Sequence, residues 1–349
     1  MPRRLFSGVL GALSQDMAID LGTTTTRVHV RKRGVMCAEP SMVALYADPR
    51  GERRVLAVGT EARAMWGRTP SDIEVVRPLR EGVIADFEVT EALLRLLMHQ
   101  CMGPNHVVRP RAVLTVPYGT TEVEKRAMRE CAEAAGAREV HLVEEVLAAA
   151  IGAGLDVTEP HGNMVVDIGG GTTEVAVVSL GGIVYSRSLK VGGEQMDEAL
   201  TTHLEQVRGL RIGPVTAENL KTGLGSAHER ARFDGERVAQ VSGRDVVTGF
   251  PRGLEVHADE VRGALAGIVH LIVETLLAAL DKTAPELAAD IVDKGIVLTG
   301  GGAQLRGLDR ALGEATGLPV VVAEDPGNAV ARGAGQTLEE LEFLEAVAV

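Results

Sequence analysis

Aromatic residues are scarce in this 349-residue chain, which has one Trp, three Tyr and five Phe. Recognition of nucleic-acid bases by stacking on aromatic side chains therefore has little support. Basic residues are outnumbered as well, because 36 Lys and Arg stand against 48 Asp and Glu, for a net charge of −12. Since a phosphate backbone attracts a basic surface, we expect no nucleic-acid partner.

Cysteine is also scarce, and long apolar runs are missing. Cys37, Cys101 and Cys131 lie far apart, are odd in number and include no pair at metal-ligand spacing, which is typical of a reducing cytoplasm. No apolar run approaches the length of a membrane span, and the N-terminus shows no convincing cleavable signal. We therefore expect a cytoplasmic protein, long enough for two domains with separate cores.

The most informative stretch is residues 164–180, where an apolar run ends at Asp167, three glycines follow, and a β-branched run begins at Glu174. This pattern predicts strand, tight turn and strand. A P-loop or a Rossmann turn would need a helix directly after the glycines, so the pattern excludes both. Unblocked backbone N–H groups in such a turn can bind phosphate oxygens. Asp167 beside phosphates favours a Mg²⁺ ion held directly or through water. The alternative is a structural turn with a solvated Asp.

A second copy of this pattern occurs near the start of the chain. Residues 18–30 align without a gap on residues 165–177, with Asp20 on Asp167 and Gly22 on Gly169. Two like hairpins, one in each half, predict two similar domains that hold one phosphate chain from opposite sides. The alternative of two unrelated structural turns does not explain the shared residues.

A third glycine site follows the apolar residues 296–299, with a helix expected over residues 305–316. Strand, glycines and helix in this order suit an adenosine and its α-phosphate. Residues 140–145 predict a strand that ends in Glu144 and Glu145, where α/β folds often place their chemistry. Residues 38–83 and 194–256 resemble insertions into the two domains.

The N-terminal segment is short, basic and amphipathic. Arg3 and Arg4 precede apolar residues at helical spacing, which suits a membrane surface. The alternative is a packing or disordered tail, because two glycines weaken the helix. The apolar residues that we expect to enter the membrane are Leu5, Phe6, Leu10 and Leu13.

Five segments resemble, in order, the signature segments of the actin-like ATPases, a superfamily that includes sugar kinases and heat-shock chaperones: residues 20–26, 143–154, 165–178, 298–308 and 325–335. The local amino-acid sequence is most similar to that of the MreB family of bacterial actin-like rod-shape proteins at residues 39–41, 67–70, 82–87, 167–176 and 285–288. The resemblance covers about residues 16–340.

The resemblance implies an α/β actin-like ATPase fold, with two duplicated RNase H-like domains, each with a small insertion subdomain, and an ATP cleft between them. The first domain would hold residues 1–157 and 324–349, with its insertion at about 38–83. The second would hold residues 158–323, with its insertion at about 194–256.

The resemblance also implies the ligands and the site residues. ATP phosphates would contact Gly22, Thr23, Thr24, Thr25, Gly169, Gly170, Gly171 and Thr172. The nucleoside would contact Glu218, Asn219 and Lys221, and the ribose and α-phosphate would contact Gly300, Gly301, Gly302, Ala303 and Gln304. Mg²⁺ would be held, through water, by Asp20 and Asp167.

Glu145, helped by Thr172, matches the family's residue that orients the attacking water. This assignment fits a hydrolysis that needs positioning and charge neutralisation but little covalent work by the protein. The alternative for Glu145 is a charge that merely favours a helix N-terminus, a role that suits Glu144 better.

Three positions depart from the family pattern. MreB proteins usually have Ala-Asn where Thr24-Thr25 stands, Pro where Val146 stands, and Arg where Asn219 stands. These departures bear on nucleotide affinity and on the rate of hydrolysis.

The function implied by the resemblance is a slow ATPase that polymerises into membrane-associated filaments and organises cell-wall synthesis and cell shape. Its partners would be further copies of itself, the inner face of the cell membrane and the membrane proteins of cell-wall elongation. Paired protofilaments would meet at Val123, unless this residue packs in its own core. The loop that begins at Cys101 is a second candidate for the membrane anchor. A non-polymerising ATPase switch or scaffold and a small-molecule kinase are the alternatives.

Overall fold

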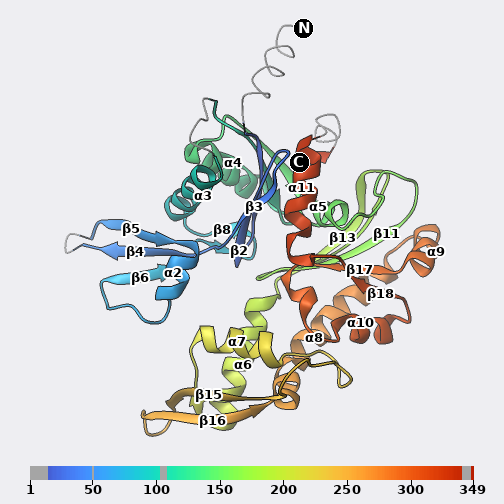
Figure 1. Cartoon of the computed structure of the whole chain (residues 1–349). Coiled ribbons are helices and arrows are strands. Elements are labelled where there is room, and N and C mark those ends of the chain that lie inside the picture. The colour runs from blue at the N-terminus through green and yellow to red at the C-terminus, as the bar shows by residue number, and fades with distance from the viewer. Residues whose placement is uncertain (1–14, 49–50, 103–107, 340–346) are drawn as a thin grey trace.

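The computed structural model describes residues 15–48, 51–102, 108–339 and 347–349. Two five-stranded sheets form the centres of the two halves of the molecule, with helices between and around them (Figure 1).

The first sheet has the strand order β10-β9-β1-β2-β3. β1 pairs antiparallel with β2 and parallel with β9, and the residues of β1 are all buried. The sheet strands are β1 (Met17–Leu21), β2 (Thr25–Val30), β3 (Gly34–Pro40), β9 (Arg111–Val116) and β10 (Glu139–Glu144).

The second sheet repeats this order and these directions, as β18-β17-β11-β12-β13. Its strands are β11 (Asn163–Ile168), β12 (Thr173–Ser179), β13 (Gly182–Leu189), β17 (Ile296–Thr299) and β18 (Val320–Val322). The β1–β2 hairpin therefore corresponds to the β11–β12 hairpin, and the predicted duplication is confirmed in the topology. The domain limits at residues 157 and 324 stay a prediction.

Two helices lie between the sheets, α5 (Glu145–Gly152) and α11 (Ala329–Glu339). α5 contacts strands of both sheets, and α11 packs along α5 and on the first sheet. The outer face of the first sheet is covered by α3 (Phe87–Cys101) and α4 (Glu122–Ala135). The second half is covered by α6 (Gly193–Arg208), α8 (Ala258–Asp281), α9 (Pro285–Lys294) and α10 (Leu308–Thr316).

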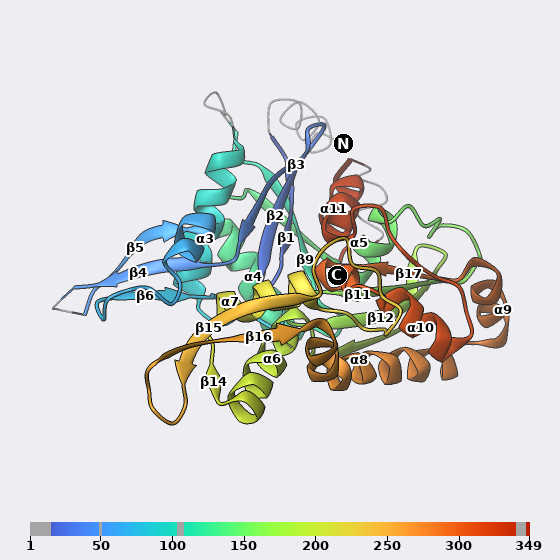
Figure 2. The ribbon, with the colours of Figure 1, turned by 60° about the horizontal axis from the view of Figure 1, so that its bottom comes forward.

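Each half carries a small insertion, as predicted from the sequence. The first contains a three-stranded sheet and a helix, formed by β4 (Val43–Ala47), β5 (Arg53–Val58), β6 (Ile73–Val76) and α2 (Gly59–Met65), followed by the short pair β7 (Leu79–Arg80) and β8 (Val83–Ile84). The second contains β14 (Leu210–Arg211), α7 (Pro214–Leu224), β15 (Val238–Asp245) and β16 (Pro251–His257). Figure 2 turns the β15–β16 hairpin toward the viewer.

The chain after the third glycine site differs from the prediction. A short 3₁₀ helix, η1 (Gly301–Gln304), comes first, and α10 begins only at Leu308 instead of Leu305. The reason is local, because Gly307 at the N-cap of α10 has a φ of 72° and interrupts the helical path.

The expectation that no apolar run approaches the length of a membrane span is wrong for α8. An 18-residue window of this 24-residue helix has a mean hydropathy of 2.0, so α8 is long and apolar enough, by length and composition, to cross a membrane. α8 packs on β12 and β13 and contributes Leu265, Ile272 and Leu276 to the core of the second half. The apolar composition of α8 therefore serves, at least in part, the packing of this core.

Candidate functional site

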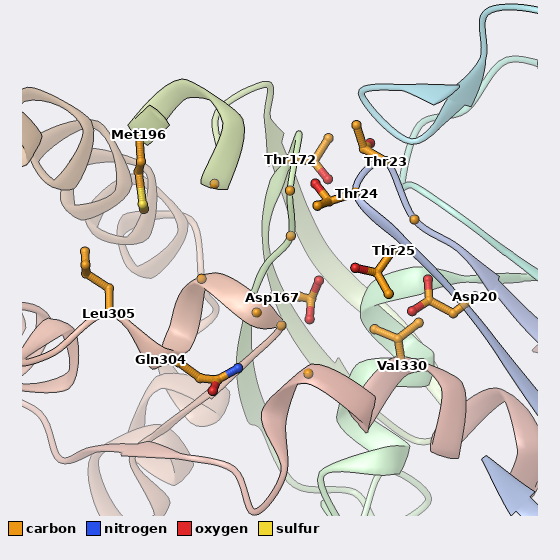
Figure 3. Close-up of a pocket in the computed structure, with 18 of the residues that line it drawn as sticks. Asp20, Thr23, Thr24, Thr25, Asp167, Thr172, Met196, Gln304, Leu305 and Val330 are labelled. Carbon is orange, nitrogen blue, oxygen red and sulfur yellow. The ribbon is translucent and has the colours of Figure 1, made fainter. Parts of the chain in front are cut away.

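The turns of the two hairpins contact each other. A Cβ atom placed on Gly170 would lie 1.8 Å from the hydroxyl oxygen of Thr24. Only glycine therefore leaves room for the opposite turn, whereas the sequence explained these glycines by phosphate binding alone. The contact brings residues 22–24 and 169–172, far apart in the chain, to one place (Figure 3).

A cavity of about 440 Å³ opens beside this contact, a size typical of small-ligand sites. Most of the predicted site residues line it, from both hairpins, the third glycine site and α7. They are Asp20, Gly22, Thr23, Thr24, Thr25, Glu145, Asp167, Gly169, Gly170, Thr172, Glu218, Lys221, Gly300, Gly301, Gly302 and Gln304.

Three predicted residues do not line the cavity. Gly171 lies against Thr23 and the backbone of Glu81, Ala303 is buried in the core of the second half, and Asn219 is exposed on α7. Their contact with a nucleotide stays a prediction.

The cavity also has lining residues that the sequence reasoning missed: Arg27, Gly82, Gly193, Met196, Thr222, Leu305, Arg306, Gly327 and Val330. Several of them lie within a few residues of a recognised motif, so a wider reading of each motif could have found them. Met196 and Leu305 form an apolar wall at the end away from the hairpins (Figure 3).

Three carboxyl groups, those of Asp20, Glu145 and Asp167, line the hairpin end of the cavity. Burial raises the pKa of Asp167 to about 6. A hydrogen bond of 2.7 Å donated by the Thr299 hydroxyl lowers this pKa, but by less than burial raises it. Burial and the neighbouring carboxylates raise the pKa of Glu145 well above its usual range. Burial likewise raises the pKa of Asp20. A bound cation would favour the charged forms of all three groups.

The donors at this end fit a Mg²⁺ ion held through water. Carboxylate and hydroxyl oxygens are the ligands that Mg²⁺ prefers, and it usually keeps several of its waters. Among the described residues, no three His, Cys, Asp or Glu side chains come together closely enough to hold a metal directly. In addition, the hydroxyl oxygen of Thr24 is buried without a hydrogen-bond partner, which suits a site completed by a polar ligand.

Arg27 reaches this end of the cavity from β2. One guanidinium nitrogen lies 3.4 Å from Oδ2 of Asp20, its neighbour across the hairpin, and Nε donates to Oδ1 of Asn328 at 3.0 Å. Asn328 belongs to the 3₁₀ helix η2 (Pro326–Asn328), which follows the second sheet. Arg27 thereby joins the first hairpin to the start of α11.

The corresponding residue of the second hairpin is Glu174, directly opposite Asp167. It is 1% exposed, and its Oε1 accepts a hydrogen bond of 2.9 Å from the backbone N–H of Tyr118, just before α4. Its Oε2 is buried and has no hydrogen-bond partner, although Ser188 lies opposite on β13. Burial raises the pKa of Glu174 to about 8.

At the other end of the cavity, polar contacts join α7 to α6. Nζ of Lys221 donates to the carbonyl oxygen of Gly193 at 2.7 Å and pairs with Asp197 at 2.8 Å. These bonds fix α7 against the start of α6, beside the predicted nucleoside position.

Three ion pairs join the two halves around the cavity. Glu218 on α7 pairs with Arg63 on α2 at 2.9 Å. Arg77 pairs with Glu194, and Lys190 pairs with Glu81 at 2.5 Å. All six side chains remain partly exposed, so these contacts lie at the water-facing side of the halves.

Val123 is the second residue of α4 and is 78% exposed, so the alternative that it packs in its own core is wrong. The capping box of Thr121 and Glu124 fixes the start of α4. The predicted membrane residues Leu5, Phe6, Leu10 and Leu13, and most of the loop after Cys101, lie outside the described residues.

Comparison with known proteins gives consistent matches along the chain. The family model for MreB/Mbl proteins matches residues 14–346. The cell shape-determining protein MreB of Escherichia coli is 50% identical over 336 residues, which cover 95% of this chain and 96% of that protein.

Solved structures agree with this match. The crystal structure of MreB5 of Spiroplasma citri bound to AMPPNP has a TM-score of 0.87 and 35% identity, covering 93% of this chain and 96% of that one. The MamK double helical filament has a TM-score of 0.77 and 26% identity, covering 93% and 99%. The actin-like α/β fold predicted from the sequence is therefore confirmed.

Proposed function

Because this chain belongs to the MreB/Mbl protein family, we propose that it binds and slowly hydrolyses Mg·ATP and polymerises into paired filaments. We place these filaments at the inner face of the cell membrane, where they would act with the membrane proteins of cell-wall elongation to set cell shape. The observation that carries the proposal is the cavity where the two equivalent hairpins meet.

The residues of the cavity divide the work of nucleotide binding. The threonine hydroxyls and the glycine N–H groups of both turns would bind the phosphates from opposite sides. Residues 300–304 would hold the ribose and α-phosphate, and Glu218 and Lys221 would border the nucleoside. When bound, Mg²⁺ would neutralise phosphate charge, with Asp20 and Asp167 holding its waters.

Glu145 and Thr172 are the proposed catalytic residues. Glu145 is the first residue of α5 and lines the cavity at the same end as the two hairpin aspartates. Its carboxylate would accept a hydrogen bond from the attacking water and so orient it toward the terminal phosphate, with Thr172 helping to place it.

The relatives support both the ligand and the assembly. The S. citri MreB5 structure holds AMPPNP, and MamK forms a double helical filament. The E. coli relative bears the name of a cell shape-determining protein.

Sedimentation and electron microscopy with Mg·ATP test the proposal, and we expect filaments made of two protofilaments. The Val123→Glu variant should bind ATP but form single protofilaments, because a like charge on a two-fold interface faces its own copy. Val247→Glu makes the same substitution at a 92% exposed residue between β15 and β16, and is the control for a general charge effect. ATP-dependent heat protection without any polymer would favour the non-polymerising switch. Unaltered double filaments of Val123→Glu would refute the pairing surface.

Anionic liposomes test the membrane part of the proposal in the same assay. Deleting residues 1–14 should release the filaments from the vesicles, because the basic and apolar residues of this segment would be lost. Equal co-sedimentation of the full and shortened chains would reject this segment as the anchor and turn attention to the loop after Cys101.

A further inference from the structure

The carboxyl groups at the hairpin end of the cavity share one internal cation. Among the described lining residues, Lys221 and Arg306 are the other cations, and both are held elsewhere. Lys221 pairs with Asp197, and Arg306 donates to the carbonyl oxygens of Thr222 and Gly225. Arg27 is thus the cation that faces Asp20, Glu145 and Asp167.

The position of Arg27 is fixed from two sides. Asp20 lies opposite it across the β1–β2 hairpin, and Asn328 accepts its Nε hydrogen bond from η2. Its side chain is 19% exposed, so water screens its charge only in part. The guanidinium therefore stays beside the carboxyl groups instead of turning out into solvent.

The charge of Arg27 changes the repulsion between the cavity's carboxyl groups and a nucleotide's phosphates. Without Arg27, each of these carboxyl groups that is ionised would repel a nucleotide's phosphates, and only a bound divalent cation would offset that charge. With Arg27 in place, part of that repulsion is removed before any Mg²⁺ arrives. Arg27 and Mg²⁺ thus act on the same repulsion.

We propose that Arg27 supplies, permanently, part of the positive charge that Mg²⁺ supplies in the phosphate site, so that nucleotide binding depends less on Mg²⁺. This inference rests on the proposed function, since it concerns the same cavity. It assigns to Arg27 a positioning and charge-balancing role in nucleotide binding and no part in the chemical step.

Calorimetric titration with ADP, in excess Mg²⁺ and in EDTA, tests this inference without hydrolysis. The measured quantity is the ratio of the dissociation constant in EDTA to that in Mg²⁺. Arg27→Gln should raise this ratio about tenfold over the unmodified chain, the size of one partly screened charge–charge interaction. Arg27→Lys, which keeps the charge, should raise it by less than about threefold, for the same reason.

Two matched variants separate charge from packing. Asn328→Ala removes the hydrogen bond to Arg27 and keeps its charge, and Arg306→Gln removes a cation from the other end of the cavity. Both should leave the ratio near that of the unmodified chain. A ratio unmoved by Arg27→Gln, or raised equally by Asn328→Ala or Arg306→Gln, overturns the inference. If the unmodified chain binds no ADP in either buffer, the proposed function fails together with the inference.

Discussion

The two hairpins have the same strand pairing but carry a basic residue in one and an acidic residue in the other at one equivalent position. In the first, Arg27 lies across the strand pair from Asp20 and forms an ion pair with it. In the second, Glu174 lies across from Asp167, and burial, with a smaller contribution from Asp167, raises the pKa of Glu174. One hairpin is balanced internally, whereas the other holds an excess of acid.

Because of this difference, we expect the two hairpins to contribute differently to nucleotide binding and to hydrolysis. The balanced hairpin should repel phosphates less, because Arg27 offsets part of the charge of Asp20, and Arg27 also connects this hairpin to η2. The acidic hairpin faces the same end of the cavity as Glu145 and, through Glu174, is bonded to the backbone of Tyr118 before α4. We therefore expect the first hairpin to govern affinity and the second to govern hydrolysis and its link to α4.

The largest expected effect is on kcat, and it should differ between variants of the equivalent residues Thr172 and Thr25. Thr172→Ala should lower kcat about a hundredfold and weaken nucleotide binding by much less, because it removes a group that positions the transition state as well as one phosphate contact. Thr25→Ala should mainly weaken binding. Glu145→Ala should lower kcat at least as much as Thr172→Ala and retain nucleotide. Single-turnover phosphate release and ADP titration measure the two quantities separately.

Equal losses of kcat in the two threonine variants would mean that the hairpins are not divided in this way. A Glu145→Ala variant that hydrolyses ATP at the unmodified rate would remove Glu145 from the chemistry. Serine at either threonine position keeps the hydroxyl and serves as the control.

A smaller effect concerns the charge of Glu174 in the nucleotide-free protein. Its folded pKa of about 8 lies well above the ordinary pKa of a glutamic acid, so its contribution to stability is greatest at low pH and is lost as the pH rises to 8. Glu174→Gln removes this loss and keeps an acceptor for Tyr118. Relative to the unmodified chain, the variant should therefore gain roughly 2 kcal/mol between pH 5 and pH 8, about half of the 1.36 kcal/mol per unit limit.

Urea unfolding at the two pH values, in EDTA, measures this difference. Arg27→Gln is the matched comparison and should show the opposite sign, because it leaves Asp20 without its cation and makes the stability fall more steeply with pH. A Glu174→Gln variant whose stability follows that of the unmodified chain at both pH values would show that Glu174 is ionised in both states.

The smallest effect tests the contact between the turns. Gly170→Ala should destabilise the protein, since its new methyl group would overlap the Thr24 hydroxyl. Thr24→Ala should relieve part of this cost, with a coupling free energy of about 1 kcal/mol in a double-mutant cycle. Gly169→Ala is the control, because its Cβ would lie 3.4 Å or more from its neighbours. Additive effects of Gly170→Ala and Thr24→Ala would mean that the turns separate in solution.

The hairpins could be predicted from the sequence because their signals are local. A strand, a glycine turn and a second strand follow from alternation and turn chemistry within about 15 residues, and the repeat of the pattern shows the duplication. The place of Glu145 at the end of a strand followed the same logic. Helix limits were less certain, and the αL conformation of Gly307 moved the start of α10.

The missed features depend on partners distant in the chain. Arg27 reads as an ordinary polar residue of a strand, and its bond to Asn328 spans 301 positions. The buried Glu174 accepts its hydrogen bond from Tyr118, which comes from the other half. The apolar composition of α8 was underestimated because its pattern reads as amphipathic and not as a continuous run.

The three ion pairs between the halves carry a consequence for timing. Because Arg63–Glu218, Arg77–Glu194 and Lys190–Glu81 are all partly exposed, each adds little stability, and added salt weakens each pair further. If the halves must part to release a nucleotide, its residence time should shorten as salt is added. The ionic strength of the surroundings would then control the rate of nucleotide exchange.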